Sequence, residues 1–299
     1  SNILNFYLNA GLIFGSNNIE EFLSTSIFNF LSVLWVPFNF PELGVKGAAI
    51  GTLIATIWGL LHYSFYLFKE QIKNKYKVFN NILDMKMLKK QLTIAYPLAF
   101  QEVLVMFSLT IFYKIIAIIG IIEMAATQII FKIMHASFMP AIGIGNACAT
   151  LVGKFLGEKN PDKAETAINE SLRGSLFIMG SVGIFFIIFA QNIIPLFIND
   201  KDVIEFAVPG LRFVGALQFI DAFCFTLWFA LTGAGDTKIP AIADIINHWL
   251  IFIPICYFLS IYCGYGYWGA WASFGIHLTC IAIFMFIRFK MGNWKYIKV

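Results

Sequence analysis

Charged residues are scarce in this chain. Asp, Glu, Lys and Arg together make up 13% of its 299 residues, hydrophobic residues make up 59%, and the mean hydropathy is +0.78. Soluble globular domains typically contain roughly 25% charged residues. The composition therefore excludes a soluble globular protein and indicates a polytopic membrane protein.

Motifs for catalysis and metal binding are also absent. The chain has no Gly-x-x-x-x-Gly-Lys-Ser/Thr phosphate loop, which argues against ATP-driven pumping, and no His-Glu-x-x-His or Gly-x-Ser-x-Gly motif of a membrane hydrolase. The five cysteines show no ligand spacing and are interpreted as packing residues. The four histidines, His62, His135, His248 and His277, also lack metal-ligand spacing, and we interpret them as packed or interfacial residues. We therefore expect neither an enzyme nor a cofactor.

Long apolar runs take up most of the chain. A transmembrane helix needs ~20 mostly apolar residues. Seven runs are long enough: 44–68, 92–120, 124–153, 167–198, 206–232, 240–262 and 267–288. A shorter run, 3–14, is interpreted as the second part of an eighth helix, and we expect the chain to be incomplete at its N-terminus. Because the alternation typical of a transmembrane barrel does not recur, the expected fold class is an all-α polytopic membrane protein.

Basic residues predict the orientation of these helices. The segment 69–91 contains seven lysines, and basic residues are retained on the cytoplasmic side of a membrane. We therefore expect this segment and the tail from Lys290 to be cytoplasmic. The segment is interpreted as a topology signal and not as a nucleic-acid patch. The expected location is the bacterial inner (plasma) membrane.

Two short similarities suggest an internal duplication. Gly44-Val-Lys-Gly-Ala-Ala resembles Gly266-Tyr-Trp-Gly-Ala-Trp, and Ile3-Leu-Asn-Phe-Tyr-Leu resembles Ile245-Ile-Asn-His-Trp-Leu. Their offsets of 222 and 242 residues differ by 20, which implies an insertion at 16–40 in the first copy. Secondary transporters are commonly built from such repeats.

The duplication predicts a division of the chain into three parts. Residues 1–68 would be the remnant of an N-terminal lobe, contributing about two helices. Residues 69–91 would connect the lobes on the cytoplasmic side, and residues 92–299 would form a complete six-helix C-terminal lobe.

An acidic residue inside an apolar run marks the candidate site. Asp221 lies in the run 206–232, and an intramembrane carboxylate usually faces a polar cavity or an ion pathway. Glu102 lies at a similar depth, because each acid is roughly 18 Å along its helix from the cytoplasmic end. Two carboxylates at one level can share a cation or hold a proton.

Three nearby polar residues extend this candidate site. Gln218 comes three residues before Asp221, on the same helical face, and offers an oxygen ligand or a hydrogen-bond donor. Asp244 and Asn247 are secondary candidates. They lie near the start of a helix, where they would act as capping residues or as further ion ligands.

The order and spacing of several segments resemble the multidrug and toxic compound extrusion (MATE) family. The segments are Asn9 to Gly15, Gly44 to Thr52, Pro97, Gly120 with Ala125 to Ile129, Met139 to Gly145, Val152 to Gly157, and Leu231 to Thr237. The resemblance implies a twelve-helix transporter with two six-helix lobes. Such a protein would export organic cations, drugs or other amphipathic compounds by alternating access, in exchange for sodium or protons. We expect it to work as a monomer in the lipid bilayer.

The resemblance also implies roles for particular residues. Family members often carry a cation-binding Asp twelve residues before the Gly-Ala-Gly-Asp turn, which is the position of Asp221, and the resemblance favours Gln128 as well. Many members place an acid eight residues after the helix proline, which here is Val105. Glu102 comes only five residues after Pro97, so the acid is displaced by about one turn. A sodium ion at Asp221 is the only metal expected.

Two alternative functions remain. A lipid-linked precursor flippase of related architecture would need more cavity-facing Arg or Lys for pyrophosphate than the few intramembrane bases of this chain. A membrane-embedded enzyme would use Glu102 and Asp221 as an acid pair, but aspartyl membrane proteases usually carry a Gly-Asp signature and Asp221 follows Ile220. Ion-coupled antiport is therefore the preferred hypothesis.

Overall fold

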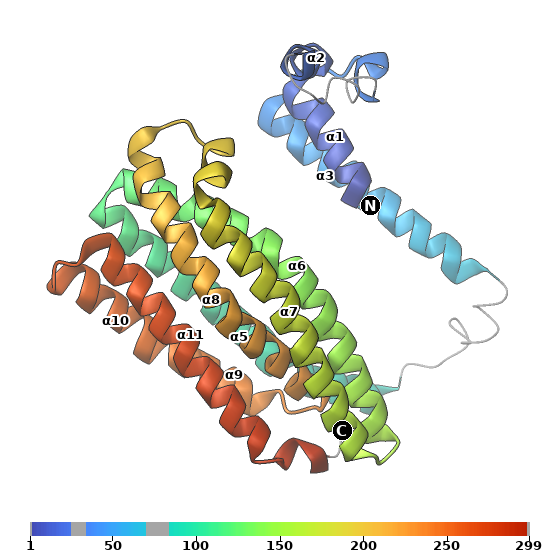
Figure 1. Ribbon diagram of the computed structural model, residues 1–299. Coiled ribbons are helices and arrows are strands. Elements are labelled where there is room, and N and C mark those ends of the chain that lie inside the picture. Colours follow the sequence, from blue (N-terminus) through green and yellow to red (C-terminus); the bar gives the residue numbers. More distant parts are fainter. Residues whose placement is uncertain (1, 25–33, 70–83, 298–299) are drawn as a thin grey trace. The chain divides into compact units, whose positions relative to one another are not determined.

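The computed structural model describes residues 2–24, 34–69 and 84–297. Every element in these ranges is a helix, which confirms the expected all-α class (Figure 1). The α-helices are α1 Asn2–Phe14, α2 Ser16–Ser24, α3 Gly44–Phe68, α5 Met85–Ile119, α6 Ile121–Gly157, α7 Pro161–Ile193, α8 Lys201–Gly233, α9 Lys238–Ile246, α10 Ile253–Tyr257 and α11 Gly266–Lys290. The other helical elements are η2 Val36–Phe38, η3 Ile194–Leu196, η4 Asn247–Phe252, η5 Phe258–Tyr262 and η6 Asn293–Tyr296.

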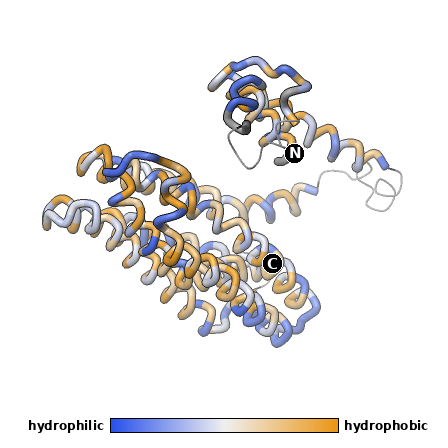
Figure 2. The backbone as a smooth tube through the Cα atoms, turned by 45° about the horizontal axis from the view of Figure 1, so that its top comes forward, coloured by the Kyte–Doolittle hydropathy of each residue, from blue (hydrophilic) through white to orange (hydrophobic). Residues whose placement is uncertain are grey.

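Seven helices in the described ranges are long and apolar enough to cross a membrane. They agree with the seven runs expected from the sequence, and the sixth is the continuous span Lys238–Tyr262, formed by α9, η4, α10 and η5. Figure 2 shows hydrophobic residues along the helices and hydrophilic residues mostly near the helix ends. A multi-pass membrane protein is therefore the consistent interpretation.

Several helices begin earlier than their apolar runs. Helix α5 starts at Met85 instead of residue 92, and α7 starts at Pro161 instead of residue 167. The start of α7 is capped by Asn160, whose side chain accepts a hydrogen bond of 3.2 Å from the backbone N–H of Lys163. Because a capped polar turn continues a helix beyond the apolar segment, apolar length alone underestimates helix length.

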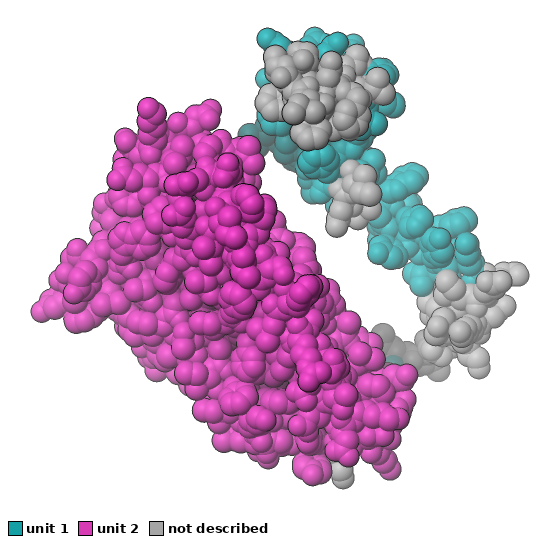
Figure 3. Space-filling model, in the orientation of Figure 1, with its two compact units in different colours: residues 1–84 teal, residues 85–299 magenta. Residues whose placement is uncertain are grey.

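The described chain forms two compact units, Ser1–Asp84 and Met85–Val299 (Figure 3). In the first unit, α1 packs along α3. Gly47 allows this close packing, because a Cβ there would meet the backbone of Leu12. Helices α2 and η2 lie within the segment expected to be an insertion, and residues 25–33 of that segment are outside the described ranges.

Helix α8 is the most enclosed span of the second unit. It packs against α6, α7 and α11. In its apolar part 56% of the residues are buried, compared with 17% to 50% in the other spans. Polar side chains in the middle of α8 are therefore surrounded by protein.

Glycines set the distance between α7 and α8. A Cβ at Gly215 would lie 2.6 Å from the carbonyl oxygen of Gly183, closer than real Cβ contacts allow. A Cβ at Gly183 would meet the carbonyl oxygen of Gly215 and would lie 3.0 Å from the Cβ of Gln218. The facing glycines therefore bring α7 directly against Gln218.

The turn after α8 is anchored to the end of α11. Gly235 has a φ of +84°, a conformation that favours glycine. The next residue, Asp236, accepts a hydrogen bond of 2.7 Å through Oδ2 from Nε of Arg288 on α11. Both side chains are largely buried, so this ion pair holds the α8–α9 turn at one end of the unit.

We expect Gly183→Val to destabilise the protein by about 1–3 kcal/mol, because the new side chain overpacks the α7–α8 contact. Gly174→Val on the same helix is the matched control, since a Cβ at Gly174 has no neighbour within 4 Å. Thermal unfolding of the purified protein in detergent measures both effects. Equal melting temperatures for the two variants would show that the glycine contact does not limit the packing.

Candidate functional site

Two groups of polar side chains lie inside the second unit. The first, named here the Asp221 site, consists of Ser137 on α6 and of Gln218 and Asp221 on α8. All three residues are buried, and Asp221 is 2% exposed. Because Gln218 and Asp221 are three residues apart on one helix, they share a face.

The hydrogen bonds of the Asp221 site leave two oxygen atoms without partners. Ser137 Oγ donates to the Met134 carbonyl at 2.6 Å, and Gln218 Nε2 donates to Ser137 Oγ at 2.9 Å. This arrangement directs the Gln218 amide nitrogen to the serine and leaves its Oε1 free. Gln218 Oε1 and Asp221 Oδ2 are both buried, and neither has a hydrogen-bond partner among the residues that the structure describes. Such acceptors cost about 1–3 kcal/mol each, so this position favours a bound cation or proton.

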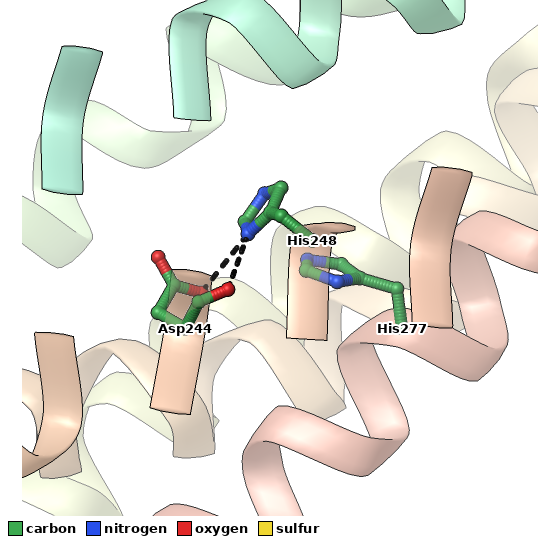
Figure 4. A group of neighbouring side chains, drawn as sticks. All are labelled: Asp244, His248 and His277. Atoms are coloured by element: carbon green, nitrogen blue, oxygen red, sulfur yellow. Dashed lines mark hydrogen bonds and ion pairs between the residues drawn. The ribbon is translucent and has the colours of Figure 1, made fainter. Parts of the chain in front are cut away.

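The second group, named the histidine cluster, contains residues from α5, α9, η4 and α11. They are Gln101, Asp244, Asn247, His248 and His277, and all are buried. Gln101 Nε2 donates to Asp244 Oδ2 at 2.6 Å, and His248 Nδ1 lies 3.2 Å from Asp244 Oδ1. Figure 4 shows the side chains of Asp244, His248 and His277 converging on one region.

Asn247 holds His277 in this cluster. Its Nδ2 lies 2.8 Å from His277 Nδ1 and donates to the His277 carbonyl at 3.0 Å. The ring centroids of His277 and His248 are 4.2 Å apart. The remaining carboxamide atom, Asn247 Oδ1, is buried and has no partner within the described ranges.

A local change of helix type positions Asn247 and His248. The segment η4 is π-helical, and the backbone N–H of Ile253 bonds to the carbonyl of His248, five residues earlier. Pro254 follows directly, and its ring would crowd the carbonyl of Leu250 in a regular α-helix. The wider turn relieves this crowding, and π-helical turns are frequent at functional sites.

The structure brings together some of the predicted site residues and separates others. Gln218 and Asp221 lie together in the interior. Glu102 on α5 and Gln128 on α6 have exposed side chains, and no hydrogen bond or ion pair joins either of them to Asp221 among the described residues. Gln101, the residue before Glu102, is the one that is buried.

The secondary candidates belong to the histidine cluster, and neither of them lies at the start of the continuous span Lys238–Tyr262. Helix α9 begins at Lys238, so Asp244 lies about 9 Å along it. The Asp244 carboxylate contacts Gln101 and His248 instead of the backbone at a helix start. The capping alternative for Asp244 is therefore wrong.

Sequence reasoning missed Gln101, His248 and His277. One signal was present, because Asp244 and His248 are four residues apart and such residues face the same side of a helix. His277 comes from α11, and only the tertiary fold brings it to this pair. The interpretation of His248 and His277 as packed or interfacial residues is therefore incomplete.

One side chain feels the charge of both groups. Cys224 follows Asp221 by three residues on α8, and its thiol is within electrostatic range of both Asp221 and Asp244. The interior of the second unit thus holds two acidic groups that act on a common neighbour.

Comparison with known proteins decides the family. The MatE family model matches residues 97–258, which is more than half of the chain. The chain belongs to the MatE (MATE) family. This MATE chain is 27% identical over 297 residues to the probable multidrug resistance protein NorM of Thermotoga maritima and 30% identical over 266 residues to the uncharacterized transporter YisQ of Bacillus subtilis. These alignments cover 99% and 88% of the chain, which spans 59% and 58% of the respective relatives.

Solved structures show the same fold. An outward-facing multidrug resistance MATE family transporter matches with a TM-score of 0.78, at 20% identity, over 98% of this chain and 63% of that one. A MATE structure in complex with MaD3S matches with a TM-score of 0.76, at 20% identity, over 98% and 62%. The expected MATE-like helical bundle is confirmed. The MATE chain is a multi-pass protein of the plasma membrane and belongs to a family of transporters, which argues against the acid-pair enzyme.

We expect Gln101→Leu to lower the free energy of unfolding of the MATE protein by about 1.5–3 kcal/mol, because the buried Asp244 carboxylate loses a hydrogen-bond donor. Glu102→Leu, at the neighbouring exposed position, should change it by less than about 0.5 kcal/mol. Denaturant titration of the purified protein compares the two. A larger effect at Glu102 would mean that the inward-facing residue of α5 has been misidentified.

Proposed function

We propose that the protein is an ion-coupled antiporter that exports organic cations, drugs or other amphipathic compounds by alternating access. The Asp221 site binds the coupling ion, which is sodium or a proton. The observation that carries this proposal is the pair of unpartnered buried oxygen atoms, Asp221 Oδ2 and Gln218 Oε1.

Electrostatics explains why such a site suits coupled exchange. A buried carboxylate without a partner costs several kcal/mol, and a proton or a monovalent cation removes that cost. Carboxylate and amide oxygens are ligands for hard cations, which makes sodium chemically suitable. The closed site is therefore stable when it holds its ion. It can release the ion in an open conformation, where water replaces the ion as the partner of the carboxylate. An ion that binds one of these conformations more tightly shifts the equilibrium between them.

The names of the relatives support the substrate class. The Thermotoga maritima relative is described as a probable multidrug resistance protein, and the outward-facing structure is that of a multidrug resistance transporter. These descriptions favour small amphipathic compounds over a lipid-linked precursor. We propose a monomeric exporter that needs no cofactor besides its coupling ion. Glu102 and Gln128 stay predicted contributors to coupling.

Asp221→Asn should abolish gradient-driven export. The amide keeps the size of the side chain but lacks the negative charge that would hold a cation or exchange a proton. Drug binding should be affected less than transport. The matched control is Asp202→Asn, at an exposed position in the first turn of the same helix. Export is measured in cells and in vesicles, with sodium and proton gradients imposed separately.

The same assay separates the two coupling ions. If sodium is the ion, Gln218→Leu should weaken sodium-driven export by removing an oxygen ligand, whereas proton-driven export needs only the carboxylate. Normal export by Asp221→Asn at an expression level equal to that of Asp202→Asn would contradict the proposed role of Asp221.

A further inference from the structure

The histidine cluster contains a different set of donor atoms from the Asp221 site. We propose that Asp244, His248 and His277 bind one divalent transition-metal ion of the zinc class, with one carboxylate and two imidazoles as its ligands. This site is distinct from the proposed coupling site and goes beyond the transport activity.

The positions of the donor atoms fit such an ion. One potential ligand atom from each of the three residues lies within 4.8 Å of the other two. Zinc binds nitrogen and oxygen at 2.0–2.2 Å in a tetrahedral arrangement, which places its ligand atoms roughly 3.3 Å apart. The three donor atoms would therefore need to approach one another by at most roughly 1.5 Å. His248 Nδ1 faces two acceptors, Asp244 Oδ1 at 3.2 Å and the Asp244 carbonyl at 3.0 Å, so it carries the ring proton and Nε2 is the nitrogen left for an ion.

A polar partner already orients one of the three ligands. Gln101 donates to Asp244 Oδ2, the carboxylate oxygen that does not face His248. Protein metal sites typically have such outer-sphere partners, which hold a ligand in its binding orientation. Asn247 Nδ2 donates to the His277 carbonyl and lies 2.8 Å from Nδ1, which holds the ring in place without accepting a ring proton. The Asp244 carboxylate is therefore arranged for binding before an ion arrives.

A second observation points to an additional ligand in this cluster. Asn247 is 4% exposed, and no described residue forms a hydrogen bond with its Oδ1 atom. This atom belongs to the carboxamide that contacts His277, so it lies at the cluster. A metal with three protein ligands usually binds a water molecule in its fourth position. Such a water would donate a hydrogen bond to Oδ1 and satisfy it.

The donor set determines which cations bind. Imidazole ligands suit zinc, copper, nickel and iron, whereas sodium, magnesium and calcium prefer oxygen ligands. One carboxylate and two neutral imidazoles leave a bound divalent ion with a net charge of about +1. The histidine cluster therefore differs in selectivity from the Asp221 site, whose unpartnered donor atoms are both oxygens.

Cobalt(II) is the probe for the experiment, because its visible absorption reports tetrahedral coordination. The purified protein is freed of any affinity tag and treated with a chelator before cobalt is titrated. We expect one cobalt ion per chain with a tetrahedral spectrum. Zinc should displace it, since zinc binds such ligands more tightly than cobalt does. Excess sodium or magnesium should leave the spectrum unchanged.

The chain contains four histidines, so two double variants, each lacking two of them, show which pair binds the metal. His248→Gln/His277→Gln should weaken cobalt and zinc binding by more than about 100-fold, and Asn247→Leu by about 10–100-fold as the loss of an outer-sphere partner. The matched control, His62→Gln/His135→Gln, removes two exposed histidines and should bind metal normally. Equal binding by the two double variants, or no stoichiometric binding by the unmodified protein, would overturn the proposal.

X-ray absorption of the zinc-loaded unmodified protein makes the test independent of variant folding. We expect two imidazole nitrogens and additional oxygen ligands around zinc. A shell dominated by sulfur, or one without imidazole, would overturn the proposal. Neither measurement involves transport, so failure of the proposed antiport would leave this result unaffected.

Discussion

The enclosure of α8 by α6, α7 and α11 is the constraint on which the polar interior depends. Glycines bring other helices close to α8 on both sides of its middle. Gly215 contacts α7, and a Cβ at Gly233 would come within 2.5 Å of the Ala149 backbone on α6. Asp221 lies between these two contacts. Its side chain is therefore almost fully enclosed by the unit, with 2% of the residue exposed, and its charge must be balanced by an ion, by a proton or by a polar neighbour.

The two buried acids, Asp221 and Asp244, differ in their hydrogen-bond partners, and this difference favours different ions at the two positions. Asp244 has a carboxamide donor on one oxygen and an imidazole on the other. In the described part of the chain Asp221 Oδ2 has no hydrogen-bond partner, and neither has Oε1 of the neighbouring Gln218. An acid with satisfied oxygens is stable without a mobile ion, whereas an unsatisfied one is not. This difference supports our proposals of a coupling ion at Asp221 and of a more permanent metal in the histidine cluster.

Much of the fold could be predicted because the thickness of a bilayer sets the length of an apolar helix. That rule located the seven spans, and the rarity of intramembrane charge indicated Asp221. The rule does not locate helix starts outside the apolar region, where capping decides, and so it missed the first turns of α5 and α7. Distances along a helix gave the depth of Glu102 but not the direction of its side chain. One residue corresponds to about 100° of rotation, which is why Gln101 faces inward and Glu102 does not.

The histidine cluster shows a stricter limit on sequence reasoning. Asp244 and His248 share a helical face, but their meeting with His277 depends on the packing of α11 against the sixth span. The π-helical turn of η4 adds a local change that an apolar pattern does not contain, although Pro254 indicates that the regular helix is disturbed. The Gln101 contact requires α5 to pack beside α9, which is again a property of the tertiary fold.

The proximity of the two acids to Cys224 connects the proposed coupling site with the proposed metal site. The charge of a divalent ion in the histidine cluster is larger than the single negative charge of Asp244. The occupied cluster is therefore positive. This positive charge opposes a second cation at Asp221, and salt screens buried charges much less than exposed ones. Linkage requires the effect to be reciprocal, so an ion at Asp221 weakens metal binding by the same factor. Metal occupancy of the histidine cluster would therefore lower the affinity of the Asp221 site for its coupling ion, and zinc-class metals would act as inhibitors of ion-driven export.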